Sequence, residues 1–208
     1  MRKVSVFVEG GGDSKNQSAN IACRKAFRSV AQKLDVKNMP TFVACGSRTS
    51  TWEIAWQAYS NRDPEDCVFL LVDSEEKPSE ANNLPQFAWK HLGERQFDRW
   101  LSLSPINSNY VFLMVTTMET WLIADPSALK SFFSHNFNSD LIPDWLNLEE
   151  VEKPRPLEIL KKASAECASV YEKGKISFEI LEKVSPSIVA SRCPHAKFFF
   201  DRLVAECA

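Results

Sequence analysis

The chain has 208 residues, of which 44% are hydrophobic and 25% are charged, and its formal net charge is −2. These proportions are ordinary for a globular protein, which argues against a disordered chain. The charge argues against a protein that coats nucleic acid non-specifically, because such proteins usually carry a basic excess. We expect no membrane segment and a cytoplasmic location, since no apolar run approaches about 20 residues and no signal-peptide pattern is present.

Residues 4–13 combine a strand pattern with a glycine-rich turn. The apolar run 4–8 is followed by Glu9, three glycines and Asp13. This order predicts a strand that ends in a tight turn, where the backbone can approach a ligand closely. Neither a Walker loop nor a dinucleotide-binding fingerprint is complete here, because Lys15 lacks the flanking residues of the first and replaces the third glycine of the second. The alternative is that the turn only lets the next helix pack closely.

Strands and helices alternate in the first 126 residues. The predicted strands are 4–8, 41–45, 67–72 and 110–115, and the predicted helices are 18–34, 51–60, a region within 87–101, and 118–124. This alternation is typical of an α/β fold with a mostly parallel, four-stranded sheet flanked by helices. Beyond residue 126 only helical patterns occur, at 157–171, 178–184 and 194–205. We therefore expect an α/β domain over 1–126 and a helical C-terminal extension over 127–208 that packs on it.

The six cysteines form no C-x-x-C pair, so their spacing does not indicate a zinc site. Several lie within apolar runs, where a free cysteine acts as a small hydrophobic residue. In a reducing cytosol we expect most of them to be buried free thiols.

Three of the predicted strands end in acidic residues. Glu9 follows the first strand, Asp73 and Glu75 follow the third, and Glu119 follows the fourth. In a parallel sheet these ends share one edge, and clustered carboxylates repel unless a cation or protons neutralise them. Oxygen ligands of this kind suit Mg²⁺ or Mn²⁺, which could activate a water against a phosphodiester. The alternative is that acids follow buried strands only because loops are polar.

The motifs Glu9-Gly10-Gly11-Gly12-Asp13 and Asp73-Ser74-Glu75, each after a strand, resemble the TOPRIM fold. That fold is the metal-binding domain of type IA and type II topoisomerases, bacterial primases and OLD-family nucleases. The resemblance covers roughly residues 3–125. The second TOPRIM motif is usually Asp-x-Asp, and Glu75 departs from it with a longer side chain that can still ligate a metal.

A closer resemblance covers nearly the whole chain. The segments that carry it are Met118-Glu119-Thr120-Trp121, Ala124-Asp125-Pro126, Lys153-Pro154 and Arg192-Cys193-Pro194-His195. They resemble a bacterial TOPRIM-like family of unknown function whose members are often encoded beside AAA-type ATPases. The resemblance implies an ATPase partner and a role in mobile-element or anti-phage defence.

The resemblance also implies roles for single residues. Glu9 would be a general acid/base or a metal ligand, Asp73 and Glu75 would hold the metal ion, and Glu119 would be a further acid at the same edge. Asp13 would support the metal ligands without binding the metal itself.

Two cations and one histidine complete the candidates. Arg48 and Lys15 lie on turns at the same predicted edge, where they could pair with phosphate. His195 follows a proline at an expected helix start, and we interpret it as a structural hydrogen-bonding residue rather than a base.

Three functions follow from these patterns. The first is a Mg²⁺-dependent nuclease that hydrolyses phosphodiesters of nucleic acid. The second is a non-catalytic partner or effector subunit of an AAA-type ATPase, which the Glu75 departure and the mild acidity favour. The third and weakest is a phosphotransfer enzyme acting on a small molecule with the same metal edge.

Overall fold

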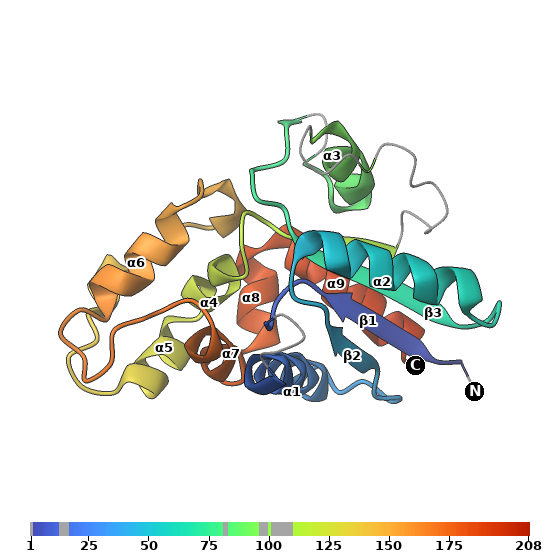
Figure 1. Cartoon of the computed structure of the whole chain (residues 1–208). Helices are drawn as coiled ribbons and strands as arrows, with labels where there is room; N and C mark the ends of the chain where they lie inside the picture. Colours follow the sequence, from blue (N-terminus) through green and yellow to red (C-terminus); the bar gives the residue numbers. More distant parts are fainter. Residues whose placement is uncertain (1, 13–16, 81–82, 96–99, 101–109) are drawn as a thin grey trace.

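The computed structural model describes residues 2–12, 17–80, 83–95, 100 and 110–208, and its centre is a four-stranded sheet (Figure 1). The strands are β1 Val4–Val8, β2 Thr41–Ala44, β3 Cys67–Asp73 and β4 Val111–Met114. They lie in the order β2-β1-β3-β4, and every pairing is parallel. The predicted α/β class is confirmed, and the sheet is entirely rather than mostly parallel. Both β3 and β4 are buried along their whole length, as expected for strands covered on both faces.

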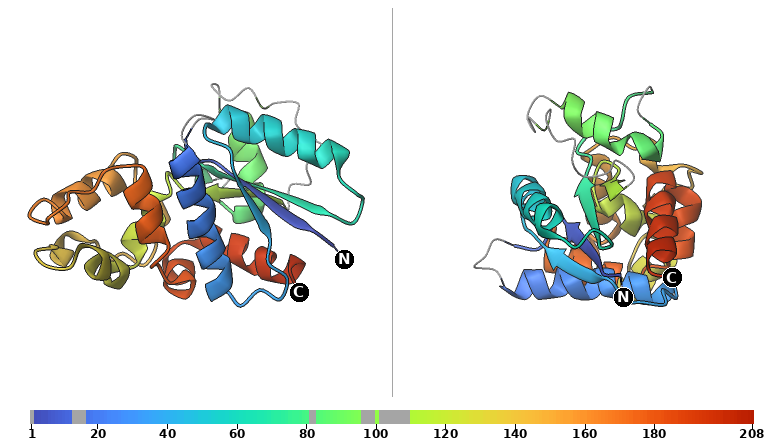
Figure 2. Two further views of the ribbon diagram at one scale, coloured as in Figure 1. Left: turned by 60° about the horizontal axis from the view of Figure 1, so that its bottom comes forward. Right: turned by 90° about the vertical axis from the view of Figure 1, so that its right-hand side faces the viewer.

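Helices cover both faces of the sheet and extend beyond one of its ends. The α-helices are α1 Gln17–Lys33, α2 Arg48–Asn61, α3 Ala88–Glu94, α4 Glu119–Ala124, α5 Pro126–Phe133, α6 Arg155–Ala163, α7 Lys175–Leu181, α8 Pro186–Arg192 and α9 Pro194–Glu206. One apolar core joins the sheet to α1, α4, α7 and α9, and a second core joins the opposite face to α2 and α3. The left view of Figure 2 shows α5 and α6 (yellow and orange) projecting beyond the end of the sheet at which the strands finish.

The larger core contains residues from both sides of residue 126. Phe112 of β4 contacts Phe199 of α9, with ring centroids 5.2 Å apart, and Trp121 of α4 packs edge-on against Phe200 at 5.3 Å. The C-terminal helices therefore share one hydrophobic core with the sheet. Burial of this apolar surface is the main force that holds the two parts together.

Several predicted helix bounds were wrong for local reasons. The helix predicted over 157–171 ends at Ala163, because the Ser164 hydroxyl donates to the Leu160 carbonyl and accepts from the Tyr171 N–H, which closes a loop. The pair Asp125-Pro126 ends helix α4, whose last residue is Ala124, and it also starts the unpredicted helix α5, since the Asp125 carboxylate accepts from two N–H groups of the first turn of α5.

Other segments differ less from expectation. Helix α8 was not predicted, although Ser185 before Pro186 is a start signal. In the region predicted to be helical within 87–101, the structure has α3, and residues 96–99 and 101 lie outside the described residues.

The cysteines are free thiols, and all but Cys167 are buried, which confirms the prediction. Burial raises the pKa of the Cys23 thiol to about 12, so it stays protonated in the core. Among the helices of the described residues, none has both the length and the apolar character needed to cross a bilayer.

Candidate metal centre at the carboxyl edge of the sheet

The strand order places Glu9 and Asp73 side by side. After β1 the chain moves to one side to form β2, and it then returns to the other side of β1 to form β3. The gap between β1 and β3 is thus a topological switch point, where open α/β sheets bind ligands. The Asp73 N–H donates to Oε2 of Glu9 at 3.1 Å, which ties the end of β3 to the first residue after β1.

The Asp73-Ser74-Glu75 segment bends sharply and brings a third carboxylate inward. Glu75 has φ of 66°, a left-handed conformation that non-glycine residues seldom adopt. Ser74 fixes the bend: its hydroxyl accepts from the Thr116 N–H at 2.7 Å, and its carbonyl accepts from Arg95 at 2.9 Å. Asp73 and Glu75 are therefore not alternate residues of an extended chain, in which their side chains would share one side. Even so, one oxygen each from Glu9, Asp73 and Glu75 lie within 4.8 Å of one another.

Arg48 reaches the same site from the start of α2. Ser47 caps this helix by accepting from the Ser50 N–H, so the helix begins three residues before the predicted position. The Arg48 guanidinium donates to the Asp73 carbonyl and lies 3.6 Å from Oε2 of Glu9. Arg48 therefore lies at the predicted edge beside the carboxylates, but in the first turn of α2 and not on the predicted turn.

Two lysines from the C-terminal half also enter the site. Lys173 Nζ lies 3.7 Å from Oδ2 of Asp73 and 3.8 Å from Oε2 of Glu119, and Lys153 forms an ion pair with Glu75. Lys173 follows Tyr171 in the loop between α6 and α7. That loop is held by the Tyr171 hydroxyl, which donates to Oε1 of Glu119 at 2.9 Å.

Burial and mutual repulsion perturb the titration of the cluster. Burial raises the pKa of Glu9, and Arg48 only partly opposes it. Asp73 is affected more strongly: burial and the neighbouring Glu9 carboxylate raise its pKa well above the usual range, against the pull of Lys173. For Glu75, partial burial acts to raise the pKa, but the hydrogen bond and charge of Lys153 outweigh it and the pKa is lowered. Because Asp73 and Glu9 resist ionisation, the site favours a bound proton or a further cation.

A small cavity opens onto the cluster. Its volume is about 200 Å³, and its lining includes Glu9, Asp73 and Lys173 together with Gly10 and Gly11 of the glycine turn. Gly10 has φ of 135° and Gly11 has φ of 87°. A Cβ atom on Gly11 would come within 2.3 Å of the Asn20 side-chain oxygen, so the turn needs glycine here. The cavity gives a ligand access to the carboxylates of Glu9 and Asp73.

The predicted residues divide into three groups. Glu9, Asp73, Glu75 and Arg48 meet at one point. Glu119 is almost fully buried, begins α4, and is not part of the three-carboxylate cluster, although Lys173 lies close to both Glu119 and Asp73. Asp13 and Lys15 lie outside the described residues.

Sequence reasoning missed Lys173, Tyr171 and Ser177. The Ser177 hydroxyl is 2.7 Å from the Tyr171 hydroxyl and accepts from the Gly174 N–H at 3.1 Å, so it fixes the loop that carries Lys173. The Lys153-Pro154 pair carries part of the family resemblance, which gives the lysine no role. The sequence signal that could have indicated this loop is Tyr171-Glu172-Lys173-Gly174, just before α7.

The segment Arg192-Cys193-Pro194-His195 has a structural role away from the acids. His195 Nδ1 lies 2.6 Å from Oε2 of Glu149, and that carboxylate also accepts from the His195 N–H at the start of α9. Both side chains are buried. The geometry agrees with the interpretation of His195 as a structural residue.

The comparisons with known proteins place the chain in a family without assigning an activity. The model of a family described as a domain of unknown function, DUF4276, matches residues 8–204. Searches of curated proteins and of solved structures found no match. The matched segment includes Glu9, Asp73, Glu75 and the helices around them, and it carries no information on a TOPRIM relationship. The chain belongs to the DUF4276 family.

Proposed function

We propose that this protein is a divalent-metal-dependent phosphodiesterase that cuts nucleic acid, with Glu9, Asp73 and Glu75 as the metal ligands. The observation that carries the proposal is the convergence of these three carboxylates at the topological switch point, within 4.8 Å of one another. Opposite ligands of an octahedral Mg²⁺ are separated by about 4.2 Å, so small side-chain rotations suffice to close the site.

The donor set fits Mg²⁺ or Mn²⁺. All three ligands are carboxylate oxygens, which these hard cations prefer, and no cysteine is among them. The raised pKa values of Asp73 and Glu9 supply a driving force, because a dication would relieve the repulsion between buried carboxylates. A bound ion would polarise a phosphodiester and promote deprotonation of the attacking water.

The surrounding residues have complementary roles in this hydrolysis. Arg48 and Lys173 can each pair with a non-bridging phosphate oxygen as negative charge grows in the transition state. Water adds to phosphorus, the bond to the leaving sugar oxygen breaks, and one proton passes from the water to that oxygen. Glu9, which lines the cavity, would accept that proton from the water before it passes to the leaving oxygen. The TOPRIM relationship and an AAA-type ATPase partner in anti-phage defence are parts of the same proposal, supported by the motif resemblance.

One observation favours the non-catalytic alternative. Lys153 pairs with Glu75, and Lys173 lies between Asp73 and Glu119, so protein cations already offset part of the acidic charge. In that case the lysines would replace the metal, and the chain would act as a partner subunit of the ATPase. The two functions differ in whether a dication binds.

The deciding experiment is a cleavage assay on labelled single- and double-stranded DNA and RNA in Mg²⁺, Mn²⁺ or EDTA. We expect cutting that requires the metal and that is lost in both Asp73→Asn and Glu9→Gln. Leu146→Ala is the matched control, because this side chain is exposed and lines neither of the cavities that contain Glu9, Asp73 and Glu119. Equal cutting by Asp73→Asn and the unaltered protein would rule out this active site.

A further inference from the structure

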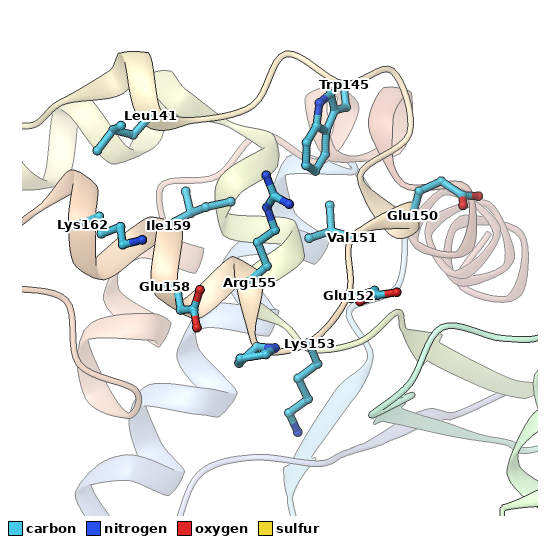
Figure 3. Close-up of a pocket in the computed structure, with 11 residues that line it drawn as sticks. Leu141, Trp145, Glu150, Val151, Glu152, Lys153, Arg155, Glu158, Ile159 and Lys162 are labelled. Carbon is cyan, nitrogen blue, oxygen red and sulfur yellow. The ribbon is translucent and has the colours of Figure 1, made fainter.

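A groove of about 560 Å³ lies between α6 and the segment that precedes it, outside the metal centre (Figure 3). Its lining includes Trp145, Arg155, Ile159 and Lys162. The Arg155 guanidinium lies over the Trp145 ring, 5.0 Å from its centroid. In Figure 3, Arg155 reaches from the start of α6 toward Trp145, while Ile159 and Lys162 project from the next turns of the same helix. An aromatic ring, a guanidinium and aliphatic surface are the groups on which nucleobases stack.

A row of cavities leads from the metal centre to this groove. Lys173 lines both the cavity at the acids and a neighbouring cavity of about 250 Å³, which also contains Glu119. Lys153 and Pro154 line that second cavity and the groove. A basic side chain therefore stands at each junction, and Arg155 and Lys162 continue the series. A series of cations along one path can pair with successive phosphates of an extended strand.

The charge of the groove distinguishes a single strand from a duplex. Glu150, Glu152 and Glu158 line it together with Lys153, Arg155 and Lys162, so the formal charges cancel. Glu150 is engaged by Lys77, and Lys153 is engaged by Glu75. A lining without excess positive charge would hold a duplex weakly, because duplex binding rests mainly on phosphate contacts. Stacking of an unpaired base does not need that excess.

The segment that presents Trp145 is fastened to the core at both ends. Arg192 donates to the carbonyl of Trp145 at 3.0 Å and to that of Pro143, and it also donates to the Ala124 carbonyl at 3.1 Å. At the other end, Glu149 is held by the buried His195. Arg192 and His195 therefore hold in place the segment that carries Trp145, a side chain that remains 39% exposed. A preorganised platform of this kind lowers the entropy lost on binding.

We infer that the groove binds a single-stranded stretch of the nucleic-acid substrate, with an unpaired base stacked on Trp145 and the flanking phosphates near Arg155 and Lys162. The inference rests on the proposed function for the direction of the strand, which would run from the metal centre through Lys173 and Lys153 into the groove. It assigns the substrate class as single-stranded or locally unpaired nucleic acid.

The test is fluorescence anisotropy with a short fluorescein-labelled oligothymidylate, in Ca²⁺, with the full chain and two substitutions of Trp145. We expect Trp145→Ala to weaken binding by about tenfold, within the range for loss of one stacked base, and Trp145→Phe to retain most of the affinity. Arg155→Gln should reduce the salt dependence of binding by about one phosphate contact. Leu146→Ala is the matched control, because Leu146 is the neighbouring residue, is 93% exposed and does not line the groove.

Three results would overturn the inference: unchanged affinity in Trp145→Ala, equal losses in Trp145→Ala and Leu146→Ala, or duplex binding as tight as single-strand binding. If Trp145→Ala no longer captured the ATPase partner but bound the oligonucleotide as tightly as the unaltered protein, the groove would be a protein-docking site. That result would also overturn the inference. Cleavage in Mn²⁺ is measured separately. If binding depends on Trp145 but no cutting occurs, single-strand binding in the groove is supported and the nuclease proposal fails. If cutting occurs but binding does not depend on Trp145, the nuclease proposal is supported and the groove inference fails.

Discussion

Replacing Asp73 by asparagine should change stability in opposite directions with and without metal. Asp73 is buried beside Glu9 and Glu119, and Lys173 at 3.7 Å offsets its charge only in part. Asparagine keeps the oxygen that accepts from the Met118 N–H at 2.9 Å and removes the charge. We therefore expect Asp73→Asn to stabilise the metal-free protein by about 1 kcal/mol, since it relieves a poorly compensated buried carboxylate.

The pH dependence has a definite sign. Folding raises the pKa of Asp73, so the folded protein holds this proton more tightly than the unfolded chain. Its contribution to folding stability is present at low pH and is lost as the pH rises from the ordinary aspartate value of about 3.9 through the raised value. The metal-free protein should accordingly lose stability with rising pH over this window, and Asp73→Asn should lose less.

A bound dication should make the unaltered protein more stable than Asp73→Asn, the opposite of the order expected without metal. A cation present at about a hundred times its Kd stabilises the folded state by about 2.7 kcal/mol, which raises the Tm of a chain of this size by about 5–10 °C. We expect Mn²⁺ to produce a shift of this order in the unaltered protein, larger at high pH, and little shift in Asp73→Asn. Differential scanning calorimetry of both proteins, with Mn²⁺ or EDTA at several pH values, measures it. A lower metal-free Tm in Asp73→Asn, or equal Mn²⁺ shifts in both proteins, would refute this reasoning.

Three further substitutions have distinct expected outcomes. Lys173→Met should tighten Mn²⁺ binding severalfold in a calorimetric titration, because it removes a competing charge, and should slow cleavage; looser binding would contradict its placement. Gly11→Ala should lower the free energy of unfolding by about 1–3 kcal/mol in urea denaturation, since the turn needs positive φ and the Cβ would meet Asn20; an unchanged midpoint would contradict this. His195→Ala should cost a similar or larger amount because it removes the imidazole and leaves the buried Glu149 carboxylate with backbone N–H partners alone, and unaltered Mn²⁺ binding would separate this effect from the metal centre.

The parts of the fold that the sequence predicted depend on local pattern. The strand β3 is a continuous apolar run, and its burial on both faces follows from that run alone. The convergence of Glu9 and Asp73 followed from parallel strands that share one edge. The position of Glu75 did not, because it depends on a left-handed bend held by Ser74, and no residue preference announces that conformation for glutamate.

The lysines of the site were beyond local reasoning. Lys173 enters because α6 ends early, at Ala163. The loop that follows is fixed by a local bond from the Tyr171 N–H to the Ser164 hydroxyl and by a long-range bond from the Tyr171 hydroxyl to Glu119. The apolar periodicity of residues 157–171 is compatible with a continued helix, so the pattern predicted one. Tertiary contacts between segments about 50 residues apart decided the outcome, and such contacts leave no periodic signal in the sequence.

The most direct test of the metal centre is an anomalous difference map from crystals soaked in Mn²⁺. The proposal predicts a strong peak between Glu9, Asp73 and Glu75, at about 2.0–2.4 Å from one oxygen of each. A map without a peak at these carboxylates, at a Mn²⁺ concentration that saturates other oxygen sites of the same crystal, would contradict it.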